Sequence, residues 1–371
     1  MFTQHTITLP DGPMVLRRAP GVPVAEKATV ALLSAARRIE AARVFVMGPG
    51  ISAAAVWAAR SGAAITAWTE NAAEAETLQA TFEAERLPPP QLFLQDDFAG
   101  LNPGSCDMAL CHLPRGRALQ IEAWKTTAAM LRPGGRLVFS GATHEGVGSA
   151  LADAKSLFGR VGVIVRKGGV HAGLAERPPT GEFLLPEVLY ETHTLTVEDM
   201  PTAVVGGTGV FAPDRLDLGA AALIAGMRIE AQMRVLELGC GTGLVALAAL
   251  RRGGNVAAVD VSARAVAATR RTLAANGYPD APVRLSIGAE AFSGQYFDVV
   301  LANPPFHKGH DVDMENAQLF ITDARKALAP QGKLYLVANA FLKYEKRLQD
   351  HFAHVSCVWE DPRFRVWEAS V

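Results

Sequence analysis

The chain has 371 residues, of which 49% are hydrophobic and 20% are charged, and its formal net charge is −1 at pH 7. This length allows two domains of common size, and the hydrophobic fraction is high enough to bury substantial cores. The near-zero charge argues against a globally basic nucleic-acid binder, so any contact with nucleic acid must come from local patches.

The cysteines and the N-terminus bear on metal binding and location. Cys106, Cys111 and His112 are the only cluster that suggests a metal site, but no second cluster matches it and no CxxC pair occurs. We therefore expect reduced thiols and no bound metal. The opening MFTQHTITLPDG has no signal-peptide pattern, and no apolar run reaches the roughly 20 residues that span a membrane. These features predict a cytoplasmic protein without a membrane partner, which we take to be a monomer.

The first half reads as strands alternating with helices. After a mixed opening, a helical pattern runs from Val24 to Ile39. The elements expected next are strand Ala42–Met47, helix Ser52–Arg60, strand Ala64–Trp68, helix Ala72–Glu85, strands Gln91–Leu94 and Asp107–Cys111, helix Leu119–Leu131 and strand Arg136–Ser140. Such alternation predicts a mostly parallel sheet with helices on both faces.

The alternation stops between Gly168 and Asp217 and then resumes. GLAERPPTGEF reads as a turn-rich linker, and LYETHTLTV and TAVVGG read as short strands. The elements expected next are helix Gly219–Arg228, strand RVLEL, a helix to Arg252, strand NVAAVD, a helix through Asn276, VRLSIG, strand FDVVLA, helix Ala317–Leu328, the strand in PQGKLYLVANAFL, and a strand pair in HVSCVWE and FRVWEAS. We place two domains at residues 1–185 and 186–371.

The two halves can be overlaid, which predicts an internal duplication of one Rossmann-like α/β domain. VFVMGPGIS from Val44 matches VLELGCGTG from Val235, and Asp107 matches Asp298, both at an offset of 191 residues. LRPGGRLVFS matches LAPQGKLYLV at an offset of 197, so the second half carries six extra residues around Phe306–Met314. Two unrelated domains of this common class are the alternative explanation.

The overlay separates an intact copy from an altered one. The positions that carry chemistry in the second half differ in the first: Val46 stands for Glu237, Ser52 for Gly243, Thr69 for Asp260, His112 for Asn303, Leu113 for Pro304 and Arg115 for Phe306. We therefore expect the second domain to hold the site and the first to have lost it.

The run Glu237-Leu-Gly239-Cys-Gly241-Thr-Gly243 predicts a nucleoside cofactor. It follows an apolar strand and opens a helix, so its glycines allow a tight turn and close backbone approach to a ligand. Asp260 ends the next strand, where a carboxylate can accept hydrogen bonds from both hydroxyls of a ribose. A tight turn beside a solvated Asp is the structural alternative.

The acid before the glycines selects among nucleoside cofactors. Dinucleotide enzymes use GxGxxG and place a pyrophosphate on the helix N-terminus, where the Glu237 carboxylate would repel it. The same carboxylate would attract the ammonium group of a methionine moiety, which favours S-adenosylmethionine over NAD. No Lys-Ser/Thr pair follows the glycines, so a nucleotide-triphosphate loop is excluded.

The strand FDVVLA runs into Asn303-Pro304-Pro305-Phe306, which predicts a rigid corner. Prolines stop regular structure and hold the preceding residue extended, so Asn303 is expected at the carboxyl end of a buried strand. Open α/β sheets bind ligands at that edge. An amide, a rigid corner and an aromatic ring form a cradle for a flat substrate, and a turn with a core Phe is the alternative.

With these motifs the chain resembles class I S-adenosylmethionine-dependent methyltransferases, and more narrowly the bacterial ribosomal RNA guanine-N2 methyltransferases of the small-subunit (RsmC-type) and related large-subunit families. The matching segments are GVFAPDRLDLGAAALI, VLELGCGTG, the AVD acid, RRTLAANG, FDVVLANPPFHKG and VANAFLKYE. The duplicated first half is also similar to that family's architecture. The resemblance implies methylation of a guanine amine in ribosomal RNA or a ribosomal subunit. It also implies that Asn-Pro-Pro-Phe holds the base, and that the first copy aids folding or RNA docking.

Guanine N2 chemistry agrees with this implication. The lone pair of the amine is delocalised into the ring, so its two N–H groups need acceptors that pull the nitrogen toward tetrahedral geometry. The Asn303 side-chain oxygen and the Pro304 carbonyl can supply them, and Phe306 can stack on the base. Catalysis is then mainly positioning, after base flipping in a duplex.

Several alternatives stay open. Adenine N6 and a glutamine amide suit the same tetrapeptide, although those families more often carry Tyr where this chain has Phe306, and a non-catalytic RNA-binding assembly factor is a third class. Glu290 is either the acceptor for the adenine amine of the cofactor or a surface residue. Asp217 either closes the cofactor end or caps a helix. His307, Lys308 and His310 either meet RNA phosphates or are solvated.

Overall fold

The computed structural model describes residues 2–9, 12–24, 26–37, 39–305 and 311–371, without the side chains of 311–316. The chain divides into two compact units, Met1–Val188 and Leu189–Val371, and each is an α/β domain built on its own seven-stranded sheet. Among the described residues, no helix is long and apolar enough to cross a bilayer.

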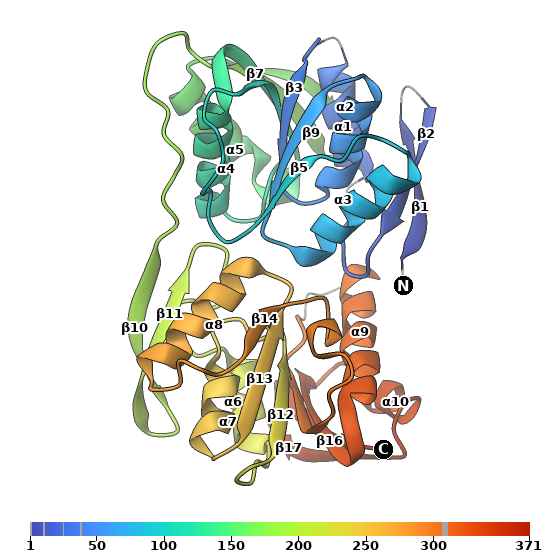
Figure 1. The fold of residues 1–371 in the computed structure, drawn as a ribbon, viewed down its shortest axis with the longest axis vertical. Coiled ribbons are helices and arrows are strands. Elements are labelled where there is room, and N and C mark those ends of the chain that lie inside the picture. The colour runs from blue at the N-terminus through green and yellow to red at the C-terminus, as the bar shows by residue number, and fades with distance from the viewer. Residues whose placement is uncertain (1, 10–11, 25, 38, 306–310) are drawn as a thin grey trace. The chain divides into compact units, whose positions relative to one another are not determined.

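The first unit opens with a hairpin and continues as alternating strands and helices (Figure 1). Its elements are β1 (Thr3–Leu9), β2 (Gly12–Arg18), α1 (Glu26–Ala36), β3 (Arg43–Met47), α2 (Ile51–Arg60), β4 (Ala64–Thr69), α3 (Ala72–Ala84), β5 (Gln91–Leu94), β6 (Cys106–His112), α4 (Arg117–Met130), β7 (Leu131–Ala142), η1 (Thr143–Glu145), α5 (Val147–Phe158), β8 (Val161–Lys167) and β9 (Val170–Glu176).

The second unit repeats this sequence of strands and α-helices. It contains β10 (Tyr190–Val197), β11 (Met200–Gly207), α6 (Leu218–Gly226), β12 (Arg234–Leu238), α7 (Leu244–Arg251), β13 (Asn255–Asp260), α8 (Ala263–Ala275), β14 (Val283–Leu285), η2 (Glu290–Phe292), β15 (Phe297–Ala302), α9 (Asp311–Ala327), β16 (Leu328–Asn339), α10 (Tyr344–Gln349), β17 (His354–Glu360) and β18 (Phe364–Ser370).

The two sheets have the same topology, which confirms the predicted fold class. Their strand orders are β5-β4-β3-β6-β7-β9-β8 and β14-β13-β12-β15-β16-β18-β17. In each sheet the first five strands pair in parallel and the remaining pairings are antiparallel. One strand order in two consecutive units is what a duplicated domain gives.

A repeated ion pair supports the duplication at the level of side chains. Arg43, the first residue of β3, donates from Nη2 to Asp107 Oδ1 at 3.2 Å, and its backbone N–H donates to Asp107 Oδ2 at 3.0 Å. Arg234, the first residue of β12, makes the same two contacts with Asp298, at 2.8 and 2.9 Å. Both pairs fasten the start of the central strand to its neighbour.

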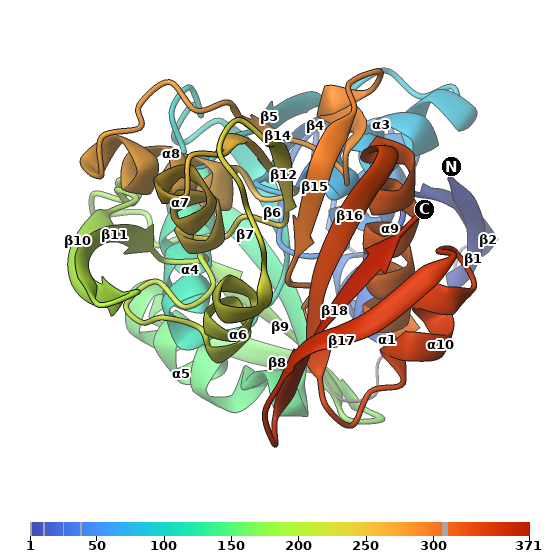
Figure 2. The same ribbon diagram turned by 90° about the horizontal axis from the view of Figure 1, so that it is seen from below.

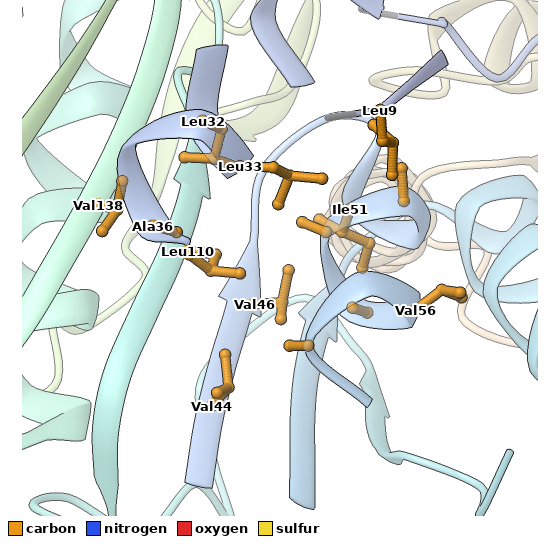
Figure 3. Close-up of a cluster of buried hydrophobic side chains, with 14 of the residues drawn as sticks. Leu9, Leu32, Leu33, Ala36, Val44, Val46, Ile51, Val56, Leu110 and Val138 are labelled. Carbon is orange, nitrogen blue, oxygen red and sulfur yellow. The ribbon is translucent and has the colours of Figure 1, made fainter. Parts of the chain in front are cut away.

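Each sheet is buried on both faces, because its central strands are apolar at successive positions. In the second unit Val235, Val299 and Leu301 face α6, α7 and α8, while Leu236 and Val300 face α9 and α10. Figure 2 shows these two helix groups on opposite sides of the second sheet. The first unit is layered in the same way, and Figure 3 shows part of its core, where side chains of β3, β6 and β7 lie alongside those of α1 and α2.

One prediction about the first unit is wrong: the expected linker GLAERPPTGEF begins inside β9, which lies between β7 and β8. The physical reason lies at Gly173, which the sequence presents as a turn residue. A Cβ at Gly173 would lie 2.4 Å from the Phe139 ring, so this glycine makes room for a core side chain within a strand. The hairpin β1–β2 in the mixed opening is a further element that the sequence did not reveal.

Candidate active site

The candidate site lies at one edge of the second sheet, where three neighbouring strands end. β12 lies between β13 and β15 and pairs in parallel with both. Gly239, Asp260 and Asn303 lie at or just past the carboxyl ends of these strands, so the structure brings the predicted cofactor loop and the predicted acceptor corner together. The chain leaves β12 toward β13 and later returns on its other side as β15, which makes this edge a topological switch point.

The glycine loop has the backbone conformation that its sequence predicts. Gly239, Gly241 and Gly243 have φ angles of 74°, 54° and 82°, all in the left-handed region that disfavours other residues. A Cβ at Gly243 would lie 2.8 Å from the Thr269 side chain, whereas a Cβ at Gly241 would enter open space. Gly243 is therefore required for packing, and Gly241 keeps a space beside the loop clear.

Asp260 holds the glycine loop and keeps acceptor capacity for a ligand. One carboxylate oxygen accepts from the Gly241 N–H at 3.0 Å, and the other accepts from the Ser262 N–H at 2.9 Å. The Val261 N–H also interacts with this carboxylate. A carboxylate has about four acceptor positions, so it can still accept from a hydroxyl group. Burial raises the pKa of Asp260, while these backbone hydrogen bonds oppose the shift.

Glu237, near the end of β12, places a buried carboxyl group at the first turn of α7. Its side chain is 3% exposed, and its Oε2 accepts from the Ala246 N–H at 2.9 Å. Burial raises the pKa of Glu237 well above its usual range, and the negative charge of Asp260 raises it further. A cation bound beside this carboxyl group would favour the ionised form and lower the pKa again.

The acceptor corner is described up to Pro305. Asn303 is half-buried, Pro304 is buried, and Asn303 donates from Nδ2 to Asp217 Oδ2 at 3.1 Å. Phe306 lies outside the described residues, as do His307, Lys308 and His310. The roles predicted for these residues stay predictions.

Asp217 and Glu290 differ in their surroundings. Asp217 caps α6, with its side chain accepting from the Ala220 N–H at 2.9 Å, and the same carboxylate contacts Asn303. The contact links a helix cap to the acceptor corner, which neither interpretation of Asp217 foresaw. Glu290 is exposed at the start of η2, after the loop that follows β14, and its role toward the adenine stays a prediction.

Helix α9 contributes two contacts that the sequence did not reveal. A Cβ at Gly239 would lie 3.0 Å from the Phe320 ring, and the buried Asp323 accepts from the Ala289 N–H at 3.4 Å. One helix therefore touches both the glycine loop and the loop after β14. Both contacts join residues more than thirty positions apart, which local patterns do not encode.

The corresponding region of the first unit is filled by its own side chains. Buried Glu74 accepts from the Gly50 N–H at 2.7 Å and the Ile51 N–H at 3.4 Å, and burial raises its pKa to about 7. His112, which stands where the second unit has Asn303, has its Nδ1 2.9 Å from Ser140 Oγ, and burial lowers its pKa to about 4. The first glycine loop therefore binds a side-chain carboxyl group of its own unit, and an imidazole occupies the corner.

Comparison with known proteins gives the family. The Methyltransferase small domain family matches residues 202–368. The "Ribosomal RNA small subunit methyltransferase C" of Stutzerimonas stutzeri is 32% identical over 83% of this chain and 89% of that protein. The protein of the same name from Chromohalobacter salexigens is 40% identical over 48% of this chain and 53% of that protein.

A solved structure matches nearly the whole chain. The T. thermophilus 16S rRNA N2 G1207 methyltransferase (RsmC), in complex with AdoMet and guanosine, has a TM-score of 0.85 and 25% sequence identity, covering 99% of this chain and 98% of that one. The fold and the site thus define a class I S-adenosylmethionine-dependent methyltransferase. More narrowly, the chain belongs to the ribosomal RNA small subunit methyltransferase C family, which confirms the resemblance described above.

Proposed function

We propose that this protein transfers a methyl group from S-adenosylmethionine to the exocyclic N2 amine of a guanine in small-subunit ribosomal RNA, acting in the cytoplasm as a monomer. The observation that carries the proposal is the placement of Asn303 just past the end of β15, the neighbour of the strand that leads into the glycine loop, at the switch point of the sheet. The T. thermophilus relative that binds AdoMet and guanosine supports both halves of this assignment.

The residues of the second unit fit S-adenosylmethionine. The clear space beside Gly241 admits a ligand, Asp260 keeps acceptor capacity for a ribose hydroxyl, and Glu237 can neutralise an ammonium group. We assign these roles to them together with Gly239 and Gly243, whose left-handed conformations shape the loop. When bound, the cofactor supplies an electrophilic methyl group on a sulfonium.

The acceptor corner would activate the amine by hydrogen bonding. The Asn303 side-chain oxygen and the Pro304 carbonyl accept hydrogen bonds from the two N–H groups of N2. These hydrogen bonds draw the lone pair of the nitrogen out of conjugation with the ring. Phe306 stacks on the base in this proposal. The nitrogen loses a proton to water after it gains the methyl group, so the protein supplies positioning rather than a strong base.

The first unit has a supporting role in this proposal. Glu74 and His112 fill its former site, so we assign residues 1–185 to folding and to docking of ribosomal RNA or the ribosomal subunit. Residues 186–371 then carry cofactor binding and catalysis.

Nucleoside mass spectrometry of 16S rRNA with and without the protein tests the proposed function. We expect N2-methylguanosine to depend on the wild-type protein and to fall to a small residual amount with Asn303→Ala. The purified variant should still bind S-adenosylmethionine by calorimetry, because Asn303 belongs to the acceptor half. A product on adenine N6 or on a protein glutamine would contradict the proposal, as would loss of cofactor binding in the variant.

A further inference from the structure

We propose that Asp217 is a positioning residue, which fixes the Asn303 side-chain amide so that its oxygen, and not its NH2 group, is offered to the acceptor amine. This inference rests on the proposed function and names the residue that controls its central hydrogen bond. Asp217 lies 86 positions before Asn303 in the sequence, and their contact exists only in the folded unit.

A single carboxylate oxygen makes the connection. Asp217 Oδ2 accepts from the Ala220 N–H at 2.9 Å and from Asn303 Nδ2 at 3.1 Å. The first hydrogen bond fixes the carboxylate to the first turn of α6, and the second fixes the amide at the end of β15. The orientation of Asn303 is thereby tied to a buried helix rather than to solvent.

The acceptor-only character of a carboxylate decides which way the amide lies. The two ends of an Asn side chain have nearly the same shape, so sterics alone do not separate the two flipped states. Beside a carboxylate, the flipped state would place two oxygens about 3 Å apart, whereas the observed state makes a charge-assisted hydrogen bond. Asp217 thus leaves Asn303 Oδ1 as the group that can accept from guanine N2.

Gly219 provides the space for this arrangement. A Cβ at Gly219 would lie 2.9 Å from Asn303 Oδ1 and 3.0 Å from Asp217 Oδ2, so any larger residue would displace the amide. At the same offset of 191 residues the first unit has Ala28. There the helix–corner contact is made instead by Thr29 Oγ1, 3.3 Å from His112 Nε2. The acid has a counterpart there, Glu26 at the same offset, so the glycine is the residue of the pair that occurs only beside Asn303.

A helix cap alone does not account for the Asn303 contact. Ser caps helices about as well as Asp. Its hydroxyl oxygen is one bond closer to the backbone, so it cannot also reach the Asn303 side chain at the end of β15. Asp217→Ser should therefore preserve helix α6 but remove the hydrogen bond to the Asn303 side chain. Asp217→Asn keeps an oxygen that can accept both hydrogen bonds, so it serves as the conservative rescue. Asn71→Ser, at the cap of α3, is the matched control for a cap exchange outside the second unit.

The test is a double-mutant cycle in single-turnover methyl transfer from labelled S-adenosylmethionine to small ribosomal subunits. We expect Asp217→Ser to slow methyl transfer about tenfold or more while its cofactor affinity stays within about twofold of wild type. The transfer rate of Asp217→Asn should stay within a few-fold of the wild-type rate. In the Asn303→Ala background, Asp217→Ser should add no further loss. Equal losses in both backgrounds, or a loss of cofactor affinity that explains the slower rate, would overturn the inference.

A second measurement separates this inference from the proposed function. In NMR spectra of the ¹⁵N-labelled protein, the chemical shifts of the two side-chain amide protons of Asn303 should change in Asp217→Ser, and the difference between them should become smaller. Asn71→Ser should leave both unchanged. Unchanged signals would overturn the positioning role whatever the enzyme methylates. If the wild-type product proved to be a different amine, the proposed function would fail, and the same cycle on that amine would still report on Asp217.

Discussion

At the scale of single residues, the buried acid Glu237 makes cofactor binding depend on pH. Its pKa is raised well above the usual range, chiefly by burial, so it takes up a proton at a higher pH than an exposed glutamate does. The protonated acid does not attract an ammonium group. We expect the affinity for S-adenosylmethionine to fall as the pH is lowered through this raised pKa, which calorimetry at a series of pH values measures.

The control for this prediction is Glu237→Gln. The amide oxygen can still accept from the Ala246 N–H, so the helix contact is kept while the charge is lost. Cofactor affinity should be about 10- to 100-fold weaker at neutral pH and should lose the part of its pH dependence that wild type alone shows. An affinity equal to that of wild type would remove Glu237 from the cofactor site.

Glu74 in the first unit predicts an effect of pH on stability. Its pKa is about 7 in the folded protein and 4.5 when unperturbed, so the unfolded chain loses this proton first. Stability is therefore fully present below pH 4.5 and decreases as the pH rises through 7. At about 1.4 kcal/mol per pKa unit the total loss is about 3 kcal/mol.

Comparison with Glu74→Gln isolates this effect. His112, with its pKa lowered to about 4, contributes the opposite slope between pH 4 and 6.5, but it contributes equally to both proteins. The difference in free energy of unfolding between wild type and Glu74→Gln, followed by hydrogen exchange in residues 2–188, should change by about 3 kcal/mol from pH 4.5 to 8. A constant difference would show that Glu74 is ionised in the folded protein throughout.

At the scale of elements, two residues of the glycine loop have different roles, Gly243 in packing and Gly241 in ligand binding. Gly243→Ala places a Cβ 2.8 Å from the Thr269 side chain in a left-handed conformation, so we expect a loss of about 2–4 kcal/mol in the free energy of unfolding. Gly241→Ala carries the conformational cost without a clash and should lose about 1 kcal/mol. Urea unfolding measures both, and calorimetry should show that Gly241→Ala nevertheless abolishes cofactor binding. Tight binding by that variant would place the cofactor elsewhere.

The elements that the sequence predicts well are those whose signals are local. Strand β15, the strand pair β17–β18 and the run from β12 to α8 follow from apolar runs and bounding glycines, and their predicted ends lie within a few residues of the observed ones. Strand β9 was missed because its glycine is explained by Phe139 on a different strand. A glycine in the sequence does not show whether it forms a turn or makes room for a neighbouring side chain.

The candidate site also contains residues that local patterns predict and contacts that depend on packing. The sequence predicts that Glu237, Asp260 and Asn303 come together, because each lies at or next to the end of a recognisable strand and parallel strands bring their carboxyl ends to one edge. The Asp217–Asn303 contact and the Asp323–Ala289 contact were missed because they depend on how α6 and α9 pack. Glu74 was missed because a glutamate on a polar helix reads as exposed, whereas it is 4% exposed.

At the scale of the whole molecule, two copies of one fold predict a single cofactor site per chain. The first copy keeps the strand order and the Arg43–Asp107 pair, which hold the sheet together, but Glu74 occupies the N–H groups of its glycine loop and His112 fills its corner. The second copy leaves the space beside Gly241 clear. These few side chains are the reason to expect no cofactor site in a copy that keeps the fold.

Binding stoichiometry tests this division between the copies. Calorimetry and native mass spectrometry of the full chain should give one S-adenosylmethionine per protein, and Gly241→Ala should reduce that number to zero, because no second loop can take over. Glu74→Gln should leave the number at one, since the glutamine still lies against the Gly50 and Ile51 N–H groups. Two bound cofactors in wild type, or one remaining in Gly241→Ala, would mean that the first copy has kept a working site despite its buried carboxyl group.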